Sequence, residues 1–229
     1  MTPIKALIWD LDGTLIQFKV NTIKARHKSI KILRKYGVPK EILIIDQSIL
    51  ENFSIARNYF NEIKFSSTKV NQILNEVNNV VIAVEKEAAV KASLIPGIDQ
   101  VLEFAKLEKL KQAIFTYNTY QNALISVKTA KIDHYFGVIA GRDDVKNLKP
   151  HPDHLKYVCD KLDVNFKEIL IIGDTSRDIE AAMNVGCHSI ALETHTPVFI
   201  NRDLFTKADK IIKQEGIPSE LIKILKEFL

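Results

Sequence analysis

Residues 4–9 form a short, mostly apolar run that stops at the polar loop 10–14. A run of roughly four to eight such residues bounded by a turn signal is typical of a strand buried inside a sheet. A buried strand needs hydrogen-bonded neighbours, because unpaired backbone groups away from water are costly. The chain must therefore supply further strands elsewhere.

Residues from about 17 to 92 show a different period. Apolar positions recur there at spacings of three and four, within 23–33, 49–63 and 70–88. This spacing predicts amphipathic helices. The cluster 66–68 of Ser and Thr predicts an N-terminal cap for the last helix, and Gly37-Val38-Pro39 predicts a break between helices. We therefore expect a helical subdomain without strands.

From Pro96-Gly97 onward, strand-like and helix-like segments alternate. The strands are expected at 112–116, 137–140, 169–172, 188–192 and 210–212, with helices near 98–105, 119–129, 152–162 and 177–185 and from about 218. Such alternation predicts a parallel sheet covered by helices on both faces. The first strand joins this sheet, so the helical subdomain is an insertion. We predict an α/β core domain of residues 1–16 and 93–229 and a helical domain of residues 17–92.

Composition agrees with a folded globular protein, since the 229 residues are 46% hydrophobic and 26% charged. The formal net charge is +4, and the excess of Lys and Arg lies within residues 17–92. A basic segment beside a slightly acidic one suits anionic substrates, although solvated helix faces produce the same pattern. The basic residues form no contiguous block, so nucleic acid is not indicated as a partner.

The cysteines and histidines form no recognisable metal-binding pattern. Neither Cys159 nor Cys187 sits in a CxxC motif, and such cysteine usage fits a reducing compartment. His151 and His154 open a predicted helix, and we interpret them as surface residues. No signal-peptide pattern is present, and the apolar runs are too short to cross a bilayer. We expect a cytoplasmic protein with no membrane partner; its oligomeric state is unknown.

Carboxylates follow two of the predicted strands. The first strand ends at Asp10 and Asp12, while the strand at 169–172 is followed by Asp174 and, four residues later, Asp178. Parallel strands bring their C-terminal ends to one edge of the sheet, where ligands bind in such folds. Crowded carboxylates raise each other's pKa and resist joint ionisation, which a divalent cation relieves. Oxygen ligands of this kind suit Mg²⁺.

The same edge should receive a hydroxyl and an ammonium group. Thr116 ends the strand at 112–116, and the loop after the strand at 137–140 contains Lys146 and Lys149. Either lysine could supply a positive charge, and we favour Lys149. With the carboxylates, these groups predict a site for a phosphate bridged to a metal ion.

Four segments carry this chemistry in a recognisable order: Asp10-Leu11-Asp12-Gly13-Thr14-Leu15, Ala113-Ile114-Phe115-Thr116, Lys149-Pro150 and Gly173-Asp174-Thr175-Ser176-Arg177-Asp178. In order and spacing they resemble the motifs of the haloacid dehalogenase superfamily, and within it the phosphatases similar to phosphoglycolate phosphatase. The resemblance covers nearly the whole chain and implies an open, parallel Rossmann-like sheet. It also implies that residues 17–92 are a small helical cap, which closes over the substrate and excludes water.

The resemblance implies a role for each matched side chain. Asp10 attacks phosphorus and becomes an aspartyl phosphate. Asp12 first protonates the leaving alkoxide and then activates water. Thr116 and Lys149 hold the phosphoryl oxygens and stabilise the developing charge. The family has Asn directly after the Thr, whereas here Asn118 follows one residue later, and we take it as a further phosphate-binding candidate.

The cofactor implied by the resemblance is Mg²⁺. Its ligands would be the carboxylates of Asp10 and Asp174 and the backbone carbonyl of Asp12. Asp178 would support the metal through water. The four residues are therefore the predicted metal site.

These observations predict a Mg²⁺-dependent hydrolase acting on a small phosphorylated metabolite. Phosphoglycolate, sugar phosphates, nucleotides and pyrophosphate all remain open as substrates. A phosphomutase of the same superfamily would use the same nucleophile and is one alternative. A non-catalytic protein that binds a phosphate ligand is the other.

Overall fold

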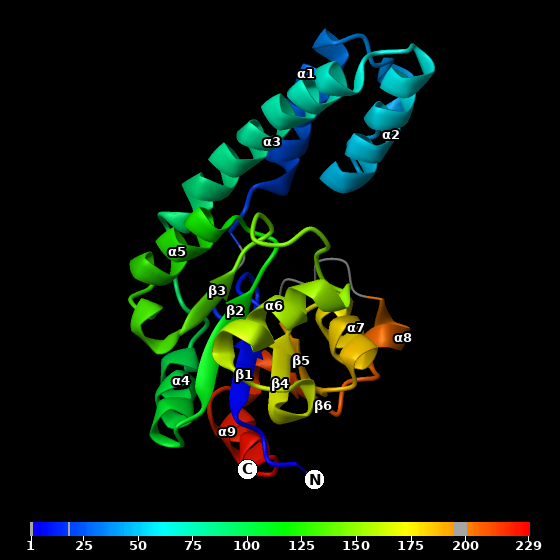
Figure 1. Cartoon of the computed structure of the whole chain (residues 1–229). Helices are drawn as coiled ribbons and strands as arrows, with labels where there is room; N and C mark the ends of the chain where they lie inside the picture. Colours follow the sequence, from blue (N-terminus) through cyan, green and yellow to red (C-terminus); the bar gives the residue numbers. More distant parts are fainter. Residues whose placement is uncertain (1, 18, 195–200) are drawn as a thin grey trace. The chain divides into compact units, whose positions relative to one another are not determined.

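The computed structural model describes residues 2–17, 19–194 and 201–229. Residues 1 and 195–200 of the predicted core domain and residue 18 of the predicted cap lie outside this description. The chain divides into two compact units, Met1–Lys19 with Ala89–Leu229, and Val20–Ala88. We call them the α/β unit and the helical unit (Figure 1).

The described strands of the α/β unit form one sheet in the order β3-β2-β1-β4-β5-β6, with every pair parallel. They are β1 Ala6–Trp9, β2 Lys111–Phe115, β3 Val138–Ala140, β4 Ile169–Gly173, β5 His188–Glu193 and β6 Lys210–Lys213. Helices join successive strands along the chain, as parallel pairing requires. The predicted parallel α/β fold is confirmed.

The register of the central strand decides which loops meet. Trp9 of β1 lies opposite Ile114 of β2 and Ile172 of β4. Because the three strands run parallel and in step, the residues that follow each of them emerge at the same edge of the sheet. This is the edge at which the sequence predicts the chemistry.

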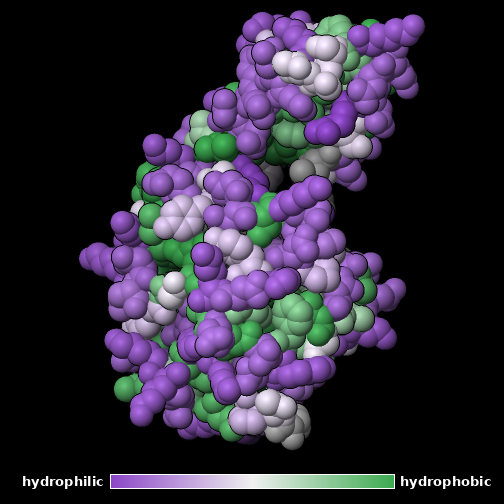
Figure 2. Space-filling view, in the orientation of Figure 1, coloured by the Kyte–Doolittle hydropathy of each residue, from purple (hydrophilic) through white to green (hydrophobic). Residues whose placement is uncertain are grey.

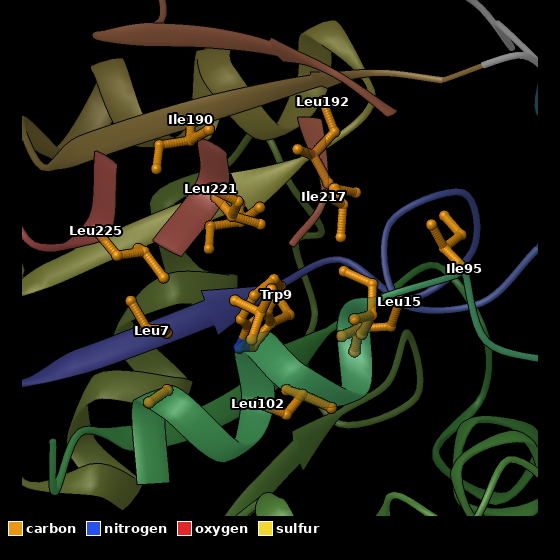
Figure 3. Close-up of a cluster of buried hydrophobic side chains, with 14 of the residues drawn as sticks. Leu7, Trp9, Leu15, Ile95, Leu102, Ile190, Leu192, Ile217, Leu221 and Leu225 are labelled. Carbon is orange, nitrogen blue, oxygen red and sulfur yellow. The ribbon is translucent and has the colours of Figure 1, made fainter. Parts of the chain in front are cut away.

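Helices α4, α5 and α9 contribute to the apolar layer on one face of the sheet. Their bounds are Ile98–Leu107, Tyr120–Thr129 and Ser219–Leu225. Figure 3 shows Leu7 and Trp9 of β1 packed between Leu102 of α4 and Leu221 and Leu225 of α9. The indole of Trp9 is fully buried, as expected for a core residue, and its N–H donates to Gln112 Oε1 at 3.2 Å.

Helices α6 and α7 cover the other face and lie next to each other over the strands in Figure 1. Their bounds are Pro152–Leu162 and Ser176–Val185. A short helix, α8, Arg202–Phe205, packs on α7; the sequence pattern did not predict it, because four residues are too few to show a period. Hydrophilic residues cover most of this face in Figure 2, so the apolar layers lie inside.

The helical unit has its own core. Its helices are α1 Thr22–Lys35, α2 Ile49–Glu62 and α3 Ser67–Ala89. Leu33, Phe60 and Val77 are fully buried within it. Helix α2 begins with a capping box in which Ser48 and Glu51 each accept a hydrogen bond from the other's backbone N–H. The role of this unit as a cap stays a prediction.

Within the described residues, no helix is long and apolar enough to cross a membrane. The predicted cytoplasmic location stays a prediction.

Candidate active site

Three buried carboxylates meet at the C-terminal edge of the sheet. Asp10 follows β1 directly, Asp174 follows β4, and Asp178 lies in the first turn of α7. One carboxylate oxygen from each lies within 4.8 Å of the other two. The exposed fractions of the three residues are 6%, 3% and 0%, respectively. Short-range repulsion between these groups is therefore not screened by water.

Lys149 reaches into this cluster from the loop between β3 and α6. Its ammonium group forms ion pairs with Asp10 and Asp178, the second with an Nζ–Oδ1 distance of 2.7 Å, and donates to the Phe115 carbonyl at 3.1 Å. Lys149 is only 2% exposed, whereas Lys146 is exposed. The structure thus selects Lys149 rather than Lys146 as the lysine of the cluster.

One lysine does not balance three carboxylates. Burial raises the pKa of Asp10 to about 6, against the opposing charge of Lys149 and with a further rise from Asp178. Burial also raises the pKa of Asp174 well above its ordinary value, and the charges of Asp10 and Asp178 add to the rise. The attraction to the two carboxylates outweighs desolvation and raises the pKa of Lys149, which keeps it charged.

Asp12 lies apart from the three-carboxylate cluster. Its side chain is partly exposed and accepts a hydrogen bond from the Asn118 amide. The backbone N–H of Asn118 in turn donates to Thr116 Oγ at 3.1 Å. The structure therefore brings Asp12, Thr116 and Asn118 into one network. Only Tyr117 lies between Thr116 and Asn118, and the Asn118 side chain nevertheless reaches Asp12.

The sequence matches one protein family over most of its length. Residues 7–192 match the model of the haloacid dehalogenase-like hydrolases. The chain belongs to this family. The match spans most of the α/β unit and the whole helical unit, so the predicted recognition and the predicted hydrolase class are confirmed.

Three curated relatives of this family member are named as phosphatases or pyrophosphatases. Phosphorylated carbohydrates phosphatase of Thermotoga maritima is 30% identical over 58% of this chain and 60% of its own length. Pyrophosphatase PpaX of Bacillus anthracis is 26% identical over 86% and 91% of the two chains. Phosphoglycolate phosphatase of Escherichia coli is 44% identical, but over only 43% of this chain and 39% of its own.

A solved structure resembles the whole chain. The β-phosphoglucomutase from Clostridium difficile has a TM-score of 0.69 and 22% identity, and the alignment covers 98% of this chain and 97% of that one. At this identity the likeness shows a shared fold.

The cluster suits the divalent cation that the haloacid dehalogenase-like family implies. The donor set consists of hard carboxylate oxygens, which Mg²⁺ prefers. The raised pKa values of Asp10 and Asp174 show that the buried cluster lacks positive charge. A dication bound among the three carboxylates would remove this deficit. The residues present therefore fit Mg²⁺.

Two residues near the site were not recognised from the sequence. The prediction that His154 lies on the surface is wrong: its exposed fraction is 0% and it packs edge-on against the Phe115 ring. The four-residue spacing from His154 to Val158 placed it on the buried face of α6, a signal that was available.

Tyr117, in the position where the family has Asn, contacts Lys149 through its hydroxyl. The prediction for His151 holds, since it is exposed and caps α6.

Gly13 offers a test of how closely the first loop approaches Asp174. Both Gly13 and Gly37 have positive φ angles, of 89° and 93°. A Cβ at Gly13 would overlap the Asp174 carboxylate, whereas a Cβ at Gly37 would meet nothing within 4 Å. Both changes to Ala carry the backbone cost of a left-handed residue, about 1–2 kcal/mol. Gly13→Ala is expected also to lower phosphate-releasing activity about 100-fold or more, whereas Gly37→Ala should keep the wild-type activity.

The two glycine variants are compared by thermal unfolding and by activity at saturating Mg²⁺. Similar melting temperatures with activity lost only in Gly13→Ala would support the close approach. Equal activity in both variants would contradict it.

Proposed function

We propose that this haloacid dehalogenase-like hydrolase cleaves a small phosphate monoester through an aspartyl phosphate on Asp10. The observation that carries the proposal is the position of Asp10, a carboxylate at the end of the central strand, paired with Lys149 and surrounded by two more buried carboxylates. A nucleophilic carboxylate beside a fixed cation and a metal-binding cluster suits attack on an anionic phosphoryl group. The named phosphatase relatives support the same chemistry.

In the first step, an Asp10 oxygen attacks phosphorus and the ester bond to the leaving oxygen breaks. Asp12 gives its proton to that oxygen, so the product leaves as a neutral alcohol. The Asn118 amide holds the Asp12 carboxyl in one orientation. Lys149 and Thr116 supply donors for the equatorial phosphoryl oxygens, where charge accumulates.

In the second step, water attacks the phosphorus of the aspartyl phosphate. Asp12, now ionised, takes the proton from this water, and the bond between phosphorus and Asp10 breaks. Phosphate leaves and both carboxyl groups return to their starting states. Asp12 thus acts as acid and then as base within one turnover.

Mg²⁺ would be held by the carboxylates of Asp10 and Asp174 and the backbone carbonyl of Asp12, with Asp178 in support. When bound, it neutralises charge on the phosphoryl group and orients it for in-line attack. Asp178 already accepts hydrogen bonds from Thr175 N at 3.0 Å and Thr175 Oγ at 2.6 Å, which fix its side chain.

The helical unit would serve as the cap over the substrate. It is inserted in the chain between the loop after β1 and helix α4, the position of the cap in the family that the sequence resembles. A cap excludes water from the reacting phosphoryl group and contacts the rest of the substrate.

The first experiment measures phosphate release from phosphoglycolate, sugar phosphates, nucleotides and pyrophosphate, with Mg²⁺ and with EDTA. Release is expected only with Mg²⁺, and the best substrate should reach a kcat/KM of about 10⁴ M⁻¹s⁻¹ or more. The compound with the highest kcat/KM identifies the substrate class. The relatives named for carbohydrate phosphates, pyrophosphate and phosphoglycolate give reason to include each of these.

The same panel separates the alternatives. Isomerisation of a hexose phosphate without release of phosphate would show that the protein is a phosphomutase and not a hydrolase. Binding of a phosphorylated compound without turnover, by folded protein with Mg²⁺, would favour a non-catalytic binding protein.

A further inference from the structure

We infer that Tyr117 and His154 together hold the backbone of Lys149 on both sides of its Cα atom and thereby position its ammonium group for the reaction. The inference rests on the proposed function, in which Lys149 contacts the phosphoryl group. Both residues act through Lys149, so they are positioning residues. Neither belongs to the motifs by which the sequence resembles its family.

The two contacts hold opposite ends of one residue. The backbone N–H of Lys149 donates to His154 Nδ1 at 3.3 Å, and its carbonyl accepts from the Tyr117 hydroxyl. Tyr117 follows β2 and His154 lies in α6, so the contacts come from separate elements. Lys149 itself lies in a turn between β3 and α6. A backbone hydrogen bond from His151 N to Leu148 O at 2.9 Å closes this turn, whereas the N–H and the carbonyl of Lys149 itself are bonded to side chains.

The hydrogen-bond pattern fixes the tautomer of His154. Its Nε2 lies 3.1 Å from the carbonyl oxygen of Ala140, which can only accept. Nε2 therefore carries the proton, and Nδ1 is free to accept from Lys149 N–H. Burial lowers the pKa of His154 to about 4, and the nearby charge of Lys149 contributes. The neutral ring that this contact needs is thus present at neutral pH.

The position of the Lys149 ammonium group depends on where its backbone lies. A lysine side chain has four rotatable carbons and a single point charge, so it is flexible unless both ends are held. The Nζ end is held by Asp10, Asp178 and the Phe115 carbonyl. During turnover, however, Asp10 forms its bond to phosphorus. The contacts from Tyr117 and His154 do not involve Asp10, so they keep the backbone and Cα atom of Lys149 in place during this step.

The Tyr117 ring makes a second contribution. Lys149 Nζ lies 5.6 Å from the ring centroid and the Arg177 guanidinium carbon lies 5.2 Å from it. An aromatic face near a cation stabilises it. The phenylalanine variant keeps this ring and removes only the hydroxyl, which separates the two contributions.

Three variants at Tyr117 and His154, with Tyr135→Phe as a control, test the inference by steady-state kinetics on the best substrate. Tyr117→Phe and His154→Leu are expected to lower kcat about 5- to 30-fold, corresponding to about 1–2 kcal/mol for a lost hydrogen bond, with KM within about twofold of wild type. His154→Asn offers an amide oxygen near the Nδ1 position and should recover kcat to within about threefold of wild type. Tyr135→Phe removes a hydroxyl bonded to Glu103 at 3.0 Å, away from the site, and should leave kcat unchanged.

The double variant Tyr117→Phe with His154→Leu tests whether the two contacts act together. Since both contacts hold the backbone of one residue, the loss in kcat of the double variant should be smaller than the product of the single losses. Losses that simply multiply would show two independent residues and overturn the joint action. A kcat equal to wild type in Tyr117→Phe and His154→Leu would overturn the inference as a whole.

Two further readouts keep structural effects and the proposed function separate. Melting temperatures of Tyr117→Phe and Tyr135→Phe should be similar. If the loss of kcat in a variant equals the fraction of that variant that is unfolded, the contacts only stabilise the fold. The ¹⁵N NMR spectrum of labelled histidine should show His154 with its proton on Nε2 at neutral pH. A proton on Nδ1 overturns the inference, even if the wild-type protein releases no phosphate and the proposed function fails.

Discussion

Replacing Asp10 with Asn is expected to reduce phosphate release by a factor of about 10⁴ or more, because the amide cannot displace an alkoxide from phosphorus. Asn has the same shape as Asp, so the surrounding layers need not move. The variant still presents an oxygen that can accept the bond from Lys149. Binding of substrate should therefore fall much less than turnover.

Asp46→Asn is the matched control, since it makes the same chemical change at an exposed residue of the helical unit. Both variants are assayed for phosphate release and for folding by circular dichroism. In the wild-type protein, rapid quenching with acid should trap a phosphoryl group on the peptide that contains Asp10, detectable by mass spectrometry. Retention of more than about a tenth of wild-type turnover by Asp10→Asn, or a phosphoryl group on another residue, would exclude Asp10 as the nucleophile.

The sequence predicted the carboxylate cluster because the end of a buried strand can be recognised from the local sequence, and the strand ends determine which side chains meet. Asp10 and Asp174 follow apolar runs that are recognisable without any knowledge of contacts. Once the strands are parallel and neighbouring, their ends meet. The alternation of strands and helices likewise predicted the sheet, because short apolar runs and the 3.6-residue period of helices are both visible in one chain.

The surroundings of Lys149 could not be predicted in the same way. The hydrogen bonds from Tyr117 and to His154 join residues 32 and five positions away, and which atoms meet depends on how α6 packs on β2 and β3. Asn118 illustrates the same limit: it was predicted to bind the substrate phosphate, and the structure bonds its side chain to Asp12. Its contact with phosphate stays a prediction.

Replacing Asp174 with Asn should stabilise the metal-free protein near pH 7.5 while abolishing its response to Mg²⁺. The folded-state pKa values of Asp174 and Asp10 are raised, that of Asp10 from 3.8 to about 6. The stability that comes from a raised carboxyl pKa is fully present below the unfolded pKa of about 4 and is lost as pH rises through the folded pKa. An amide at position 174 removes one buried charge and lowers the repulsion on Asp10, for a gain of about 1–2 kcal/mol. Thr14 Oγ, which donates to Asp174 at 3.1 Å, can donate to the amide oxygen as well.

This prediction is measured by thermal unfolding of the wild type and Asp174→Asn at pH 5 and pH 7.5, each with and without Mg²⁺. Metal-free wild type should be less stable at pH 7.5 than at pH 5, and Mg²⁺ should raise its melting temperature more at pH 7.5, where the carboxylates are ionised. Asp174→Asn should show a smaller pH effect and no Mg²⁺ effect. Asp160→Asn, an exposed change on α6, should behave as wild type in all four conditions. A Mg²⁺ effect that survives in Asp174→Asn would place the metal elsewhere, whereas a metal-free variant less stable than wild type would mean that Asp174 stabilises the fold without a cation.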